Sequence, residues 1–321
     1  MAGSRDGMGC SGAWQSGRID QDHPVRLNVR TFEPRPMAHR SLLFVPGSRP
    51  DRYDRAMMAG ADAVCIDLED AVAPDGKDAA RLAAFEFVRT LIEVPCTIGV
   101  RINAVNSLEG LADLGRLGER QNELKATPDG DMEALGAGFD FVMIPKTSSA
   151  DDVAAVRAAT TVPLWPIVES AEGLRWVWEI AAAPGVAGVL FGGADYAADL
   201  NCTMEWEPLL HARGVLAAAC ARAGVEMLDV PHLDIADEPD LIASTRRIKA
   251  MGFTGRACIH PIQIGPVHAV FTPTGVEIAH ARRVLDAFEA AGGGAALLDG
   301  KLIEKPLIRA ARRILDNAGG A

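Results

Sequence analysis

The chain has 321 residues, 49% of them hydrophobic, and a formal net charge of −11. This length can bury a large core and fits one large domain with an extension. The acidity argues against nucleic acid or an anionic membrane as a partner, because binding phosphate groups requires a basic face. No apolar run in the sequence reaches the roughly 18 residues of a membrane span.

The cysteines indicate the cellular compartment, and the N-terminal residues indicate a leader segment. Cys65, Cys96 and Cys258 lie in apolar, strand-like runs, where a free cysteine behaves as a small buried side chain. We therefore expect a reducing compartment and a cytoplasmic protein. Residues 1–38 are rich in Gly, Ser and Arg and lack a signal-peptide core, so we expect a disordered leader, with Met37 as a second candidate start.

From Arg40 onward, short apolar runs alternate with helical stretches. Strands are expected at 41–46, 63–68, 97–102, 139–145, 163–168, 187–192, 226–229 and 255–259. Helices are expected at 50–59, 77–93, 108–123, 150–159, 171–182, 206–223, 237–250 and 263–270. The strands are continuously apolar, which is typical of strands buried on both faces. Eight strand–helix units predict a TIM (β/α)8 barrel over residues 39–272, and a doubly wound open sheet is the alternative.

Residues 273–321 predict a C-terminal helical extension. A helix at about 276–291 precedes a run of three glycines, a hairpin-like turn and a last helix from Leu307 to about Asn317. Two interpretations stay open. The segment is either a mobile lid or arm exchanged between subunits, or a tail that packs against the barrel.

Glu169 and Asp195 each follow an apolar run, and one helical stretch separates them. This β-α-β pattern predicts two parallel, adjacent strands about 4.8 Å apart. Both carboxylates then lie at carboxyl ends of strands, where α/β folds place their ligand sites. Two acids there can hold Mg2+, with water and substrate oxygens as further ligands. The alternative is that each acid only begins the next helix, where a negative charge is favourable.

Three further charged residues follow or end the second and third predicted strands: Asp67, Glu69 and Arg101. The two acids alternate and should project to one face, for acid–base work beside a metal or as part of a solvated loop. The planar guanidinium of Arg101 suits a carboxylate with two hydrogen bonds. Its partner is a substrate carboxylate or an internal acid such as Glu69, and we favour both roles.

Other strand ends carry cations and glycines. Arg49, after Ser48, and Lys146 lie near predicted strand ends and could gather phosphate groups in an acidic protein. The backbone at Gly193 and Ala194 can bring N–H groups close to a carboxylate.

Seven stretches follow one another in a specific order over residues 40–264. They are RSLLFVPGSRPDRYDRA, GADAVCIDLEDAVAPDGKDAAR, VRINA, VMIPKTSS, PIVESAEG, LFGGADYAADL and GRACIHPIQI. In them the chain resembles the CitE-like branch of the HpcH/HpaI aldolase/citrate lyase family. The resemblance implies a (β/α)8 barrel that uses Mg2+, or Mn2+ in its place, to break a carbon–carbon bond in a 3-hydroxyacyl-CoA thioester. Malyl-, citramalyl- or citryl-CoA would give acetyl-CoA and an oxo acid.

The resemblance also implies roles for individual residues. Glu169 and Asp195 would bind the metal, Arg101 would bind the oxo acid, and Glu69 and Asp67 would support the site. The backbone amides of Gly193 and Ala194 would bind a carboxylate. The entrance for the thioester carrier would be lined by Ser48, Arg49 and Lys146. The segment DGKLIEKPLIRAARRIL resembles the family's lid, in which an acid reaches a neighbouring subunit's site. Here that acid is Glu304, one methylene longer than the family's aspartate.

Several alternatives stay open within this resemblance. The chain could be a citrate lyase β subunit acting on a carrier-protein thioester, a malyl-CoA thioesterase, or a catalytically silent CoA-binding regulator. The resemblance also implies a trimer or a dimer of trimers.

Overall fold

The structure is a computed structural model that describes residues 39–91, 94–126, 138–292 and 294–318. The leader expected over residues 1–38 lies outside these ranges. Eight parallel strands close into a barrel in sequence order, which confirms the predicted fold class. The strands are β1 (Ser41–Pro46), β2 (Ala63–Asp67), β3 (Thr97–Arg101), β4 (Phe141–Ile144), β5 (Leu164–Val168), β6 (Gly188–Phe191), β7 (Glu226–Asp229) and β8 (Gly255–Cys258).

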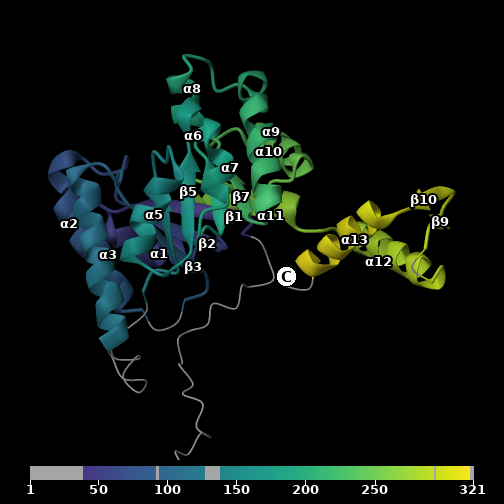
Figure 1. Ribbon diagram of the computed structural model, residues 1–321, viewed down its shortest axis with the longest axis horizontal. Coiled ribbons are helices and arrows are strands. Elements are labelled where there is room, and N and C mark those ends of the chain that lie inside the picture. The colour runs from purple at the N-terminus through teal and green to yellow at the C-terminus, as the bar shows by residue number, and fades with distance from the viewer. Residues whose placement is uncertain (1–38, 92–93, 127–137, 293, 319–321) are drawn as a thin grey trace, which may run out of the picture. The chain divides into compact units, whose positions relative to one another are not determined.

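Helices connect the strands and enclose them, as Figure 1 shows. They are α1 (Tyr53–Met57), α2 (Lys77–Arg89), α3 (Leu108–Ala126), α5 (Ala150–Ala159), α6 (Ala171–Arg175), α7 (Val177–Ala181), α8 (Gly193–Asp199), α9 (Trp206–Ala223), α10 (Glu238–Met251) and α11 (Ile264–Phe271). Short 3-10 turns occur at η1 (Pro50–Arg52), η2 (Pro74–Gly76) and η3 (Pro261–Gln263). Among the described residues, no helix is long and apolar enough to cross a membrane.

Two elements differ from the expected ones. The single helix expected at 171–182 is divided into α6 and α7 at Trp176, whose φ of −101° and ψ of 12° leave the helical region. The deviation involves one residue, so the apolar periodicity on either side gave no sign of it. The short helix α8 lies outside the helix ranges expected above, although the second interpretation of Asp195 placed this residue at the start of a helix, as it is in the structure.

The barrel interior is filled by apolar side chains that point inward from the strands. Trp165 is the largest, and it fits because Gly188 lies on the neighbouring strand. A Cβ at Gly188 would lie 2.4 Å from the indole ring, closer than packing permits. The interior cluster contains Leu42, Ala63, Cys65, Phe141, Met143, Trp165, Ile167, Leu190, Leu228 and Ala257.

A second apolar layer lies between the strands and the surrounding helices. Alternate strand residues such as Val64, Ile66 and Val100 face outward into it and are fully buried. Strands buried on both faces explain why the sequence runs are continuously apolar. Cys96 and Cys258 are buried in this layer, as their surroundings in the sequence predicted.

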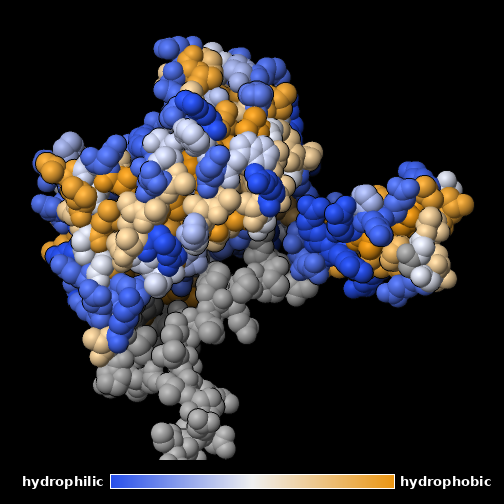
Figure 2. Space-filling view, viewed as in Figure 1, coloured by the Kyte–Doolittle hydropathy of each residue, from blue (hydrophilic) through white to orange (hydrophobic). Residues whose placement is uncertain are grey.

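The C-terminal extension consists of α12 (Gly275–Ala290), a hairpin of β9 (Ala296–Leu298) and β10 (Lys301–Ile303), and α13 (Lys305–Ala318). It has an apolar cluster of its own, in which α12 and α13 pack against each other. Leu297 and Leu302 stay 71% and 51% exposed on the hairpin. Figure 2 shows apolar surface around this hairpin.

Candidate active site

Charged side chains gather where strands β2 to β6 end. Val168 pairs with Phe191 across β5 and β6, so the predicted parallel and adjacent pair is confirmed and Glu169 lies beside Gly192. A Cβ at Gly192 would lie 2.5 Å from Glu169 Cβ and 2.7 Å from its Oε2. The absence of a side chain at Gly192 therefore gives the Glu169 carboxylate its room.

Three carboxylates surround one ammonium group. Lys146 Nζ lies 2.9 Å from Asp195 Oδ1, 3.6 Å from Glu169 Oε1 and 3.7 Å from Glu69 Oε1. The backbone N–H of Lys146 also donates a hydrogen bond to Glu169 Oε1, at 2.5 Å. We call Glu69, Glu169 and Asp195 the carboxylate cluster, and Lys146 is their shared ionic partner.

Burial changes the proton affinity of this cluster. Glu69 and Glu169 are only 7% and 4% exposed. Burial raises the pKa of Glu69 to about 7, although Arg101 acts in the opposite direction. Burial also raises the pKa of Glu169, against the effect of Lys146. Burial alone would lower the pKa of Lys146, but the neighbouring carboxylates, Glu169 foremost, raise it above its usual range.

The guanidinium of Arg101 lies next to the cluster. Its Nη1 is 3.1 Å from Glu69 Oε2, and its plane lies over the ring of Phe44 at 5.0 Å. The Glu69 Oε2 atom is buried and accepts no hydrogen bond within the described part of the chain, because the Arg101 contact lacks hydrogen-bond geometry. Among the described residues, the ionic contact with Arg101 is therefore the interaction that this oxygen makes.

A buried polar network that the sequence did not reveal supports the β2 end. Lys77 Nζ donates to the carbonyls of Leu68 and Glu69 at 2.8 and 2.7 Å, and to Asn103 Oδ1 at 2.7 Å. Asp113 accepts from the backbone N–H of Asn103 at 2.7 Å. Lys77 therefore points inward and fixes the backbone at the end of β2.

The first turn of α8 carries Gly193, Ala194 and Asp195. Asp199, at the other end of α8, accepts a hydrogen bond from the backbone N–H of Ala171 at 2.7 Å and so caps α6. Of the two aspartates on this helix, Asp195 is the one that contacts Lys146.

Ser48, Arg49 and Glu304 have no contact with the carboxylate cluster among the described residues. Arg49 pairs with Asp51 on the surface, at 2.7 Å. Ser48 Oγ lies 3.5 Å from the carbonyl of Ala71. Glu304 is exposed and lies between β10 and α13.

The donor set fits a small hard cation. Carboxylate oxygens are the ligands that Mg2+ prefers, and the cluster already holds one positive charge. Within the described ranges, no three acidic, His or Cys side chains converge closely enough to form a metal site alone. A metal here would therefore need water or substrate oxygens beside two carboxylates.

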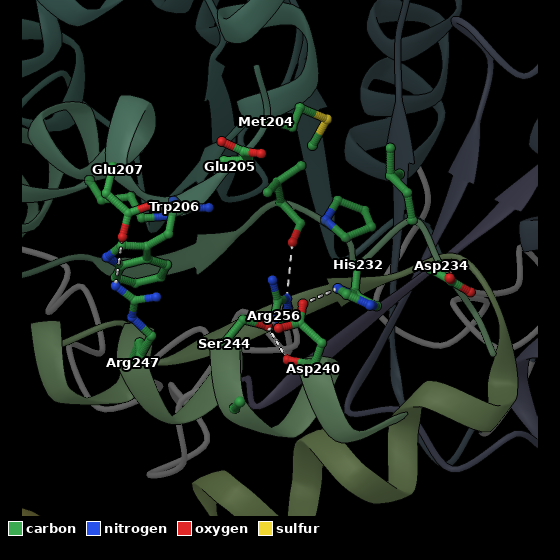
Figure 3. A pocket seen from close by; sticks show the side chains of 15 residues that line it. Met204, Glu205, Trp206, Glu207, His232, Asp234, Asp240, Ser244, Arg247 and Arg256 are labelled. Atoms are coloured by element: carbon green, nitrogen blue, oxygen red, sulfur yellow. Dashed lines mark hydrogen bonds and ion pairs between the residues drawn. The ribbon is translucent and has the colours of Figure 1, made fainter. Parts of the chain in front are cut away.

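A cavity of about 560 Å³ opens elsewhere, between α9, α10 and the loop after β7 (Figure 3). Two pairs of its lining side chains face each other. Arg247 lies 3.6 Å from Glu207, and His232 lies 3.7 Å from Asp240. None of the carboxylate cluster lines this cavity. We place the chemistry on the cluster, because burial raises the pKa of both Glu69 and Glu169, and strongly perturbed carboxylates mark candidate functional sites.

Comparison with known proteins connects this geometry to a family. The model of the HpcH/HpaI aldolase/citrate lyase family matches residues 40–261. The chain belongs to this family. The match covers the barrel and the whole carboxylate cluster, and it confirms the resemblance seen in the sequence motifs.

Relatives that match along nearly their whole length differ in activity. An L-malyl-CoA/β-methylmalyl-CoA lyase of Cereibacter sphaeroides is 34% identical over 89% of this chain and 97% of its own. A (3S)-malyl-CoA thioesterase of the same species is 36% identical over 88% and 97%. The protein CitE of Mycobacterium tuberculosis, solved with magnesium, acetoacetate and coenzyme A, has a TM-score of 0.72 and 32% identity over 88% of this chain and 99% of its own. This chain is thus an enzyme of a carbon–carbon lyase family.

Proposed function

We propose that this enzyme is a Mg2+-dependent carbon–carbon lyase that cleaves a 3-hydroxyacyl-CoA thioester, such as malyl-, citramalyl- or citryl-CoA, into acetyl-CoA and an oxo acid. The observation that carries the proposal is the convergence of Glu69, Glu169 and Asp195 on one positive charge beside Arg101. The lyase relative and the magnesium and coenzyme A bound to the solved relative support the same substrate class.

Glu169 and Asp195 are the proposed metal ligands, with Mn2+ as a substitute for Mg2+. The bound ion would polarise the oxygen at the breaking bond and neutralise charge there. The Glu169 carboxylate is positioned for metal binding by the hydrogen bond from the N–H of Lys146. The lack of a side chain at Gly192 leaves room for it. Asp195 is partly exposed, so a metal ion can reach it from solvent.

Arg101 binds the carboxylate of the oxo-acid half in this proposal. Asp67 holds two of its nitrogens, so the position of the guanidinium is fixed before substrate arrives. The amides of Gly193 and Ala194 would hold a second carboxylate oxygen. Ser48 and Arg49 would line the entrance for the thioester carrier.

The chain's own groups move the protons. A base removes the proton of the 3-hydroxyl, and Glu69, whose Oε2 lacks a hydrogen bond, is our candidate. The oxygen's electron pair then forms the new carbonyl, and the pair of the broken carbon–carbon bond moves to the thioester as an enolate. An acid returns a proton to that carbon and releases acetyl-CoA. Glu304 of a neighbouring subunit is the proposed acid, in a homotrimer or hexamer.

The test combines acetyl-CoA with glyoxylate, pyruvate or oxaloacetate, with and without Mg2+, and identifies products by mass spectrometry. A condensed acyl-CoA that forms only with Mg2+ is the expected result, since a lyase runs in both directions. Free CoA and a hydroxy acid would instead indicate a thioesterase. Turnover of only acyl-carrier-protein thioesters would indicate a citrate lyase β subunit. Binding without turnover of any substrate would contradict the enzymatic proposal.

A further inference from the structure

The ammonium of Lys146 lies where the three carboxylates of the cluster meet. Its distances to Asp195, Glu169 and Glu69 span only 2.9 to 3.7 Å, so it is shared among them rather than paired with one. An ammonium has three N–H donors, and here three acidic oxygens surround it. From the motif alone, we had expected this side chain at the substrate entrance.

The backbone directs the side chain into this position. Lys146 has a φ of 50°, in the left-handed region that residues other than glycine seldom adopt. The conformation is held on one side by the N–H bond to Glu169 Oε1, and on the other by Thr147, which is buried and bonds the carbonyl of Ile144 at 2.8 Å. A strained backbone beside a carboxylate cluster is the kind of feature that persists at functional sites.

We propose that Lys146 is a positioning residue. Its ammonium occupies the metal site as an internal counter-ion and moves out of that site when Mg2+ binds. This inference rests on the proposed function, in which Glu169 and Asp195 are the metal ligands. Mg2+ binds oxygen at about 2.0–2.1 Å. An ammonium that contacts the same two oxygens would collide with such an ion and repel it, so one cation must leave before the other enters.

The ammonium of Lys146 can move out of the metal site. The side chain is 40% exposed, and its four-carbon stem is flexible, so the ammonium can turn to solvent without a backbone change. While it stays, it offsets the repulsion among three carboxylates, two of them buried, and keeps them facing one point. Mg2+ can bind only molecules in which the ammonium has left the metal site. The apparent Mg2+ affinity is therefore the intrinsic affinity multiplied by the fraction of such molecules.

The first experiment measures the exchange directly. Chelator-treated protein is briefly acetylated with an N-hydroxysuccinimide ester, with and without saturating Mg2+, and modification of each lysine is quantified by peptide mass spectrometry. We expect Mg2+ to raise the modification of Lys146 several-fold, because the released amine becomes accessible. The exposed Lys125 is the internal reference and should not change.

The second experiment removes the counter-ion. Calorimetric titration of Lys146→Met should show that Mg2+ binds about tenfold tighter than to the natural protein. This factor corresponds to an ammonium that occupies the metal site in about nine of ten natural molecules. The metal-free variant should also melt at a lower temperature. Lys146→Gly repeats the test with a residue that accepts the positive φ and keeps the N–H donor. Lys125→Met is the matched control for loss of one distant charge.

The outcomes separate this inference from the proposed function. Natural protein that binds Mg2+ with no change in Lys146 labelling would overturn the exchange and leave the lyase proposal standing. Unchanged or weaker Mg2+ binding by both Lys146 variants would have the same meaning. If the natural protein binds no Mg2+ at all, the metal assignment and the exchange are both wrong.

Discussion

Asp67 accepts two hydrogen bonds from Arg101, from Nε at 2.7 Å and from Nη2 at 2.6 Å, and the two residues are direct partners across β2 and β3. This pairing uses one edge of the guanidinium and leaves Nη1 facing Glu69. A substrate carboxylate would therefore meet an arginine whose orientation is already set, which lowers the cost of ordering it on binding.

Asp67→Asn should reduce kcat/KM about 10- to 100-fold, the usual range for loss of a residue that orients a ligand-binding group. The amide keeps the volume but loses the charge that holds Arg101. Steady-state kinetics in the cleavage direction measures the effect. The exposed Asp151→Asn on α5 is the control, and an Asp67→Asn enzyme with natural kinetics would show that Arg101 needs no such support.

Arg101→Lys should lower kcat/KM about 100-fold or more, because lysine keeps the charge but cannot bond Asp67 and a substrate carboxylate with a planar fork. Oxo-acid binding, measured by titration of the metal-loaded enzyme, should weaken in parallel. Arg116→Lys on the exposed face of α3 is the control. Natural affinity for glyoxylate and pyruvate in Arg101→Lys would remove the residue from substrate binding.

Glu169→Ala and Asp195→Ala should abolish Mg2+ binding and Mg2+-dependent turnover with little change in the folded structure. Asp199→Ala tests the rival ligand. Because Asp199 caps α6 through the N–H of Ala171, its loss should cost about 1 kcal/mol of stability and leave metal binding intact. Calorimetry and thermal melting distinguish the two effects. Metal binding that is lost in Asp199→Ala and kept in Asp195→Ala would reverse the assignment.

The extension is proposed to complete a neighbouring subunit's site. Exposed Leu297 and Leu302 favour burial against another surface, and Glu304 follows them directly. Inactive Glu169→Ala and inactive Glu304→Ala subunits, mixed and allowed to exchange, should restore activity at about a quarter of the sites. No recovery after confirmed exchange would count against a shared site. Full activity of Glu304→Ala alone would exclude this residue from the proton transfer.

Acid stability should depend on Asp62. Burial acts to raise its pKa, but hydrogen bonds from Arg40 outweigh burial and lower it. A lowered folded pKa stabilises the protein above the unfolded value of about 3.9, and this contribution is lost as pH falls through the folded value. Asp62→Asn should therefore destabilise by about 1 kcal/mol at pH 7, since the pair is partly exposed. Urea unfolding should show the two proteins converging toward pH 3, and a constant difference would contradict the assignment.

The barrel could be predicted because burial on both faces leaves a continuous apolar signature. The expected strand at 41–46 matches β1, and the others end within about two residues of the observed bounds. The direction of Lys146 could not be predicted, because nothing in Pro145-Lys146-Thr147 indicates a left-handed lysine. The Asp67–Arg101 pair was missed for a different reason. Register between strands is set by the closed sheet, and the sequence named an internal acid such as Glu69 as the partner of Arg101 without indicating Asp67.

Closure of the barrel joins the two ends of a long segment, since Ser41–Leu43 in β1 pair with Arg256–Cys258 in β8. During synthesis β1 emerges first, and one of its edges has no partner until β8 has left the ribosome. An unpaired strand edge is prone to pair with other chains, and contacts this distant in sequence form slowly. The nascent chain therefore has a prolonged interval in which it depends on shielding of that edge, and release from this dependence comes only with the last strand of the barrel.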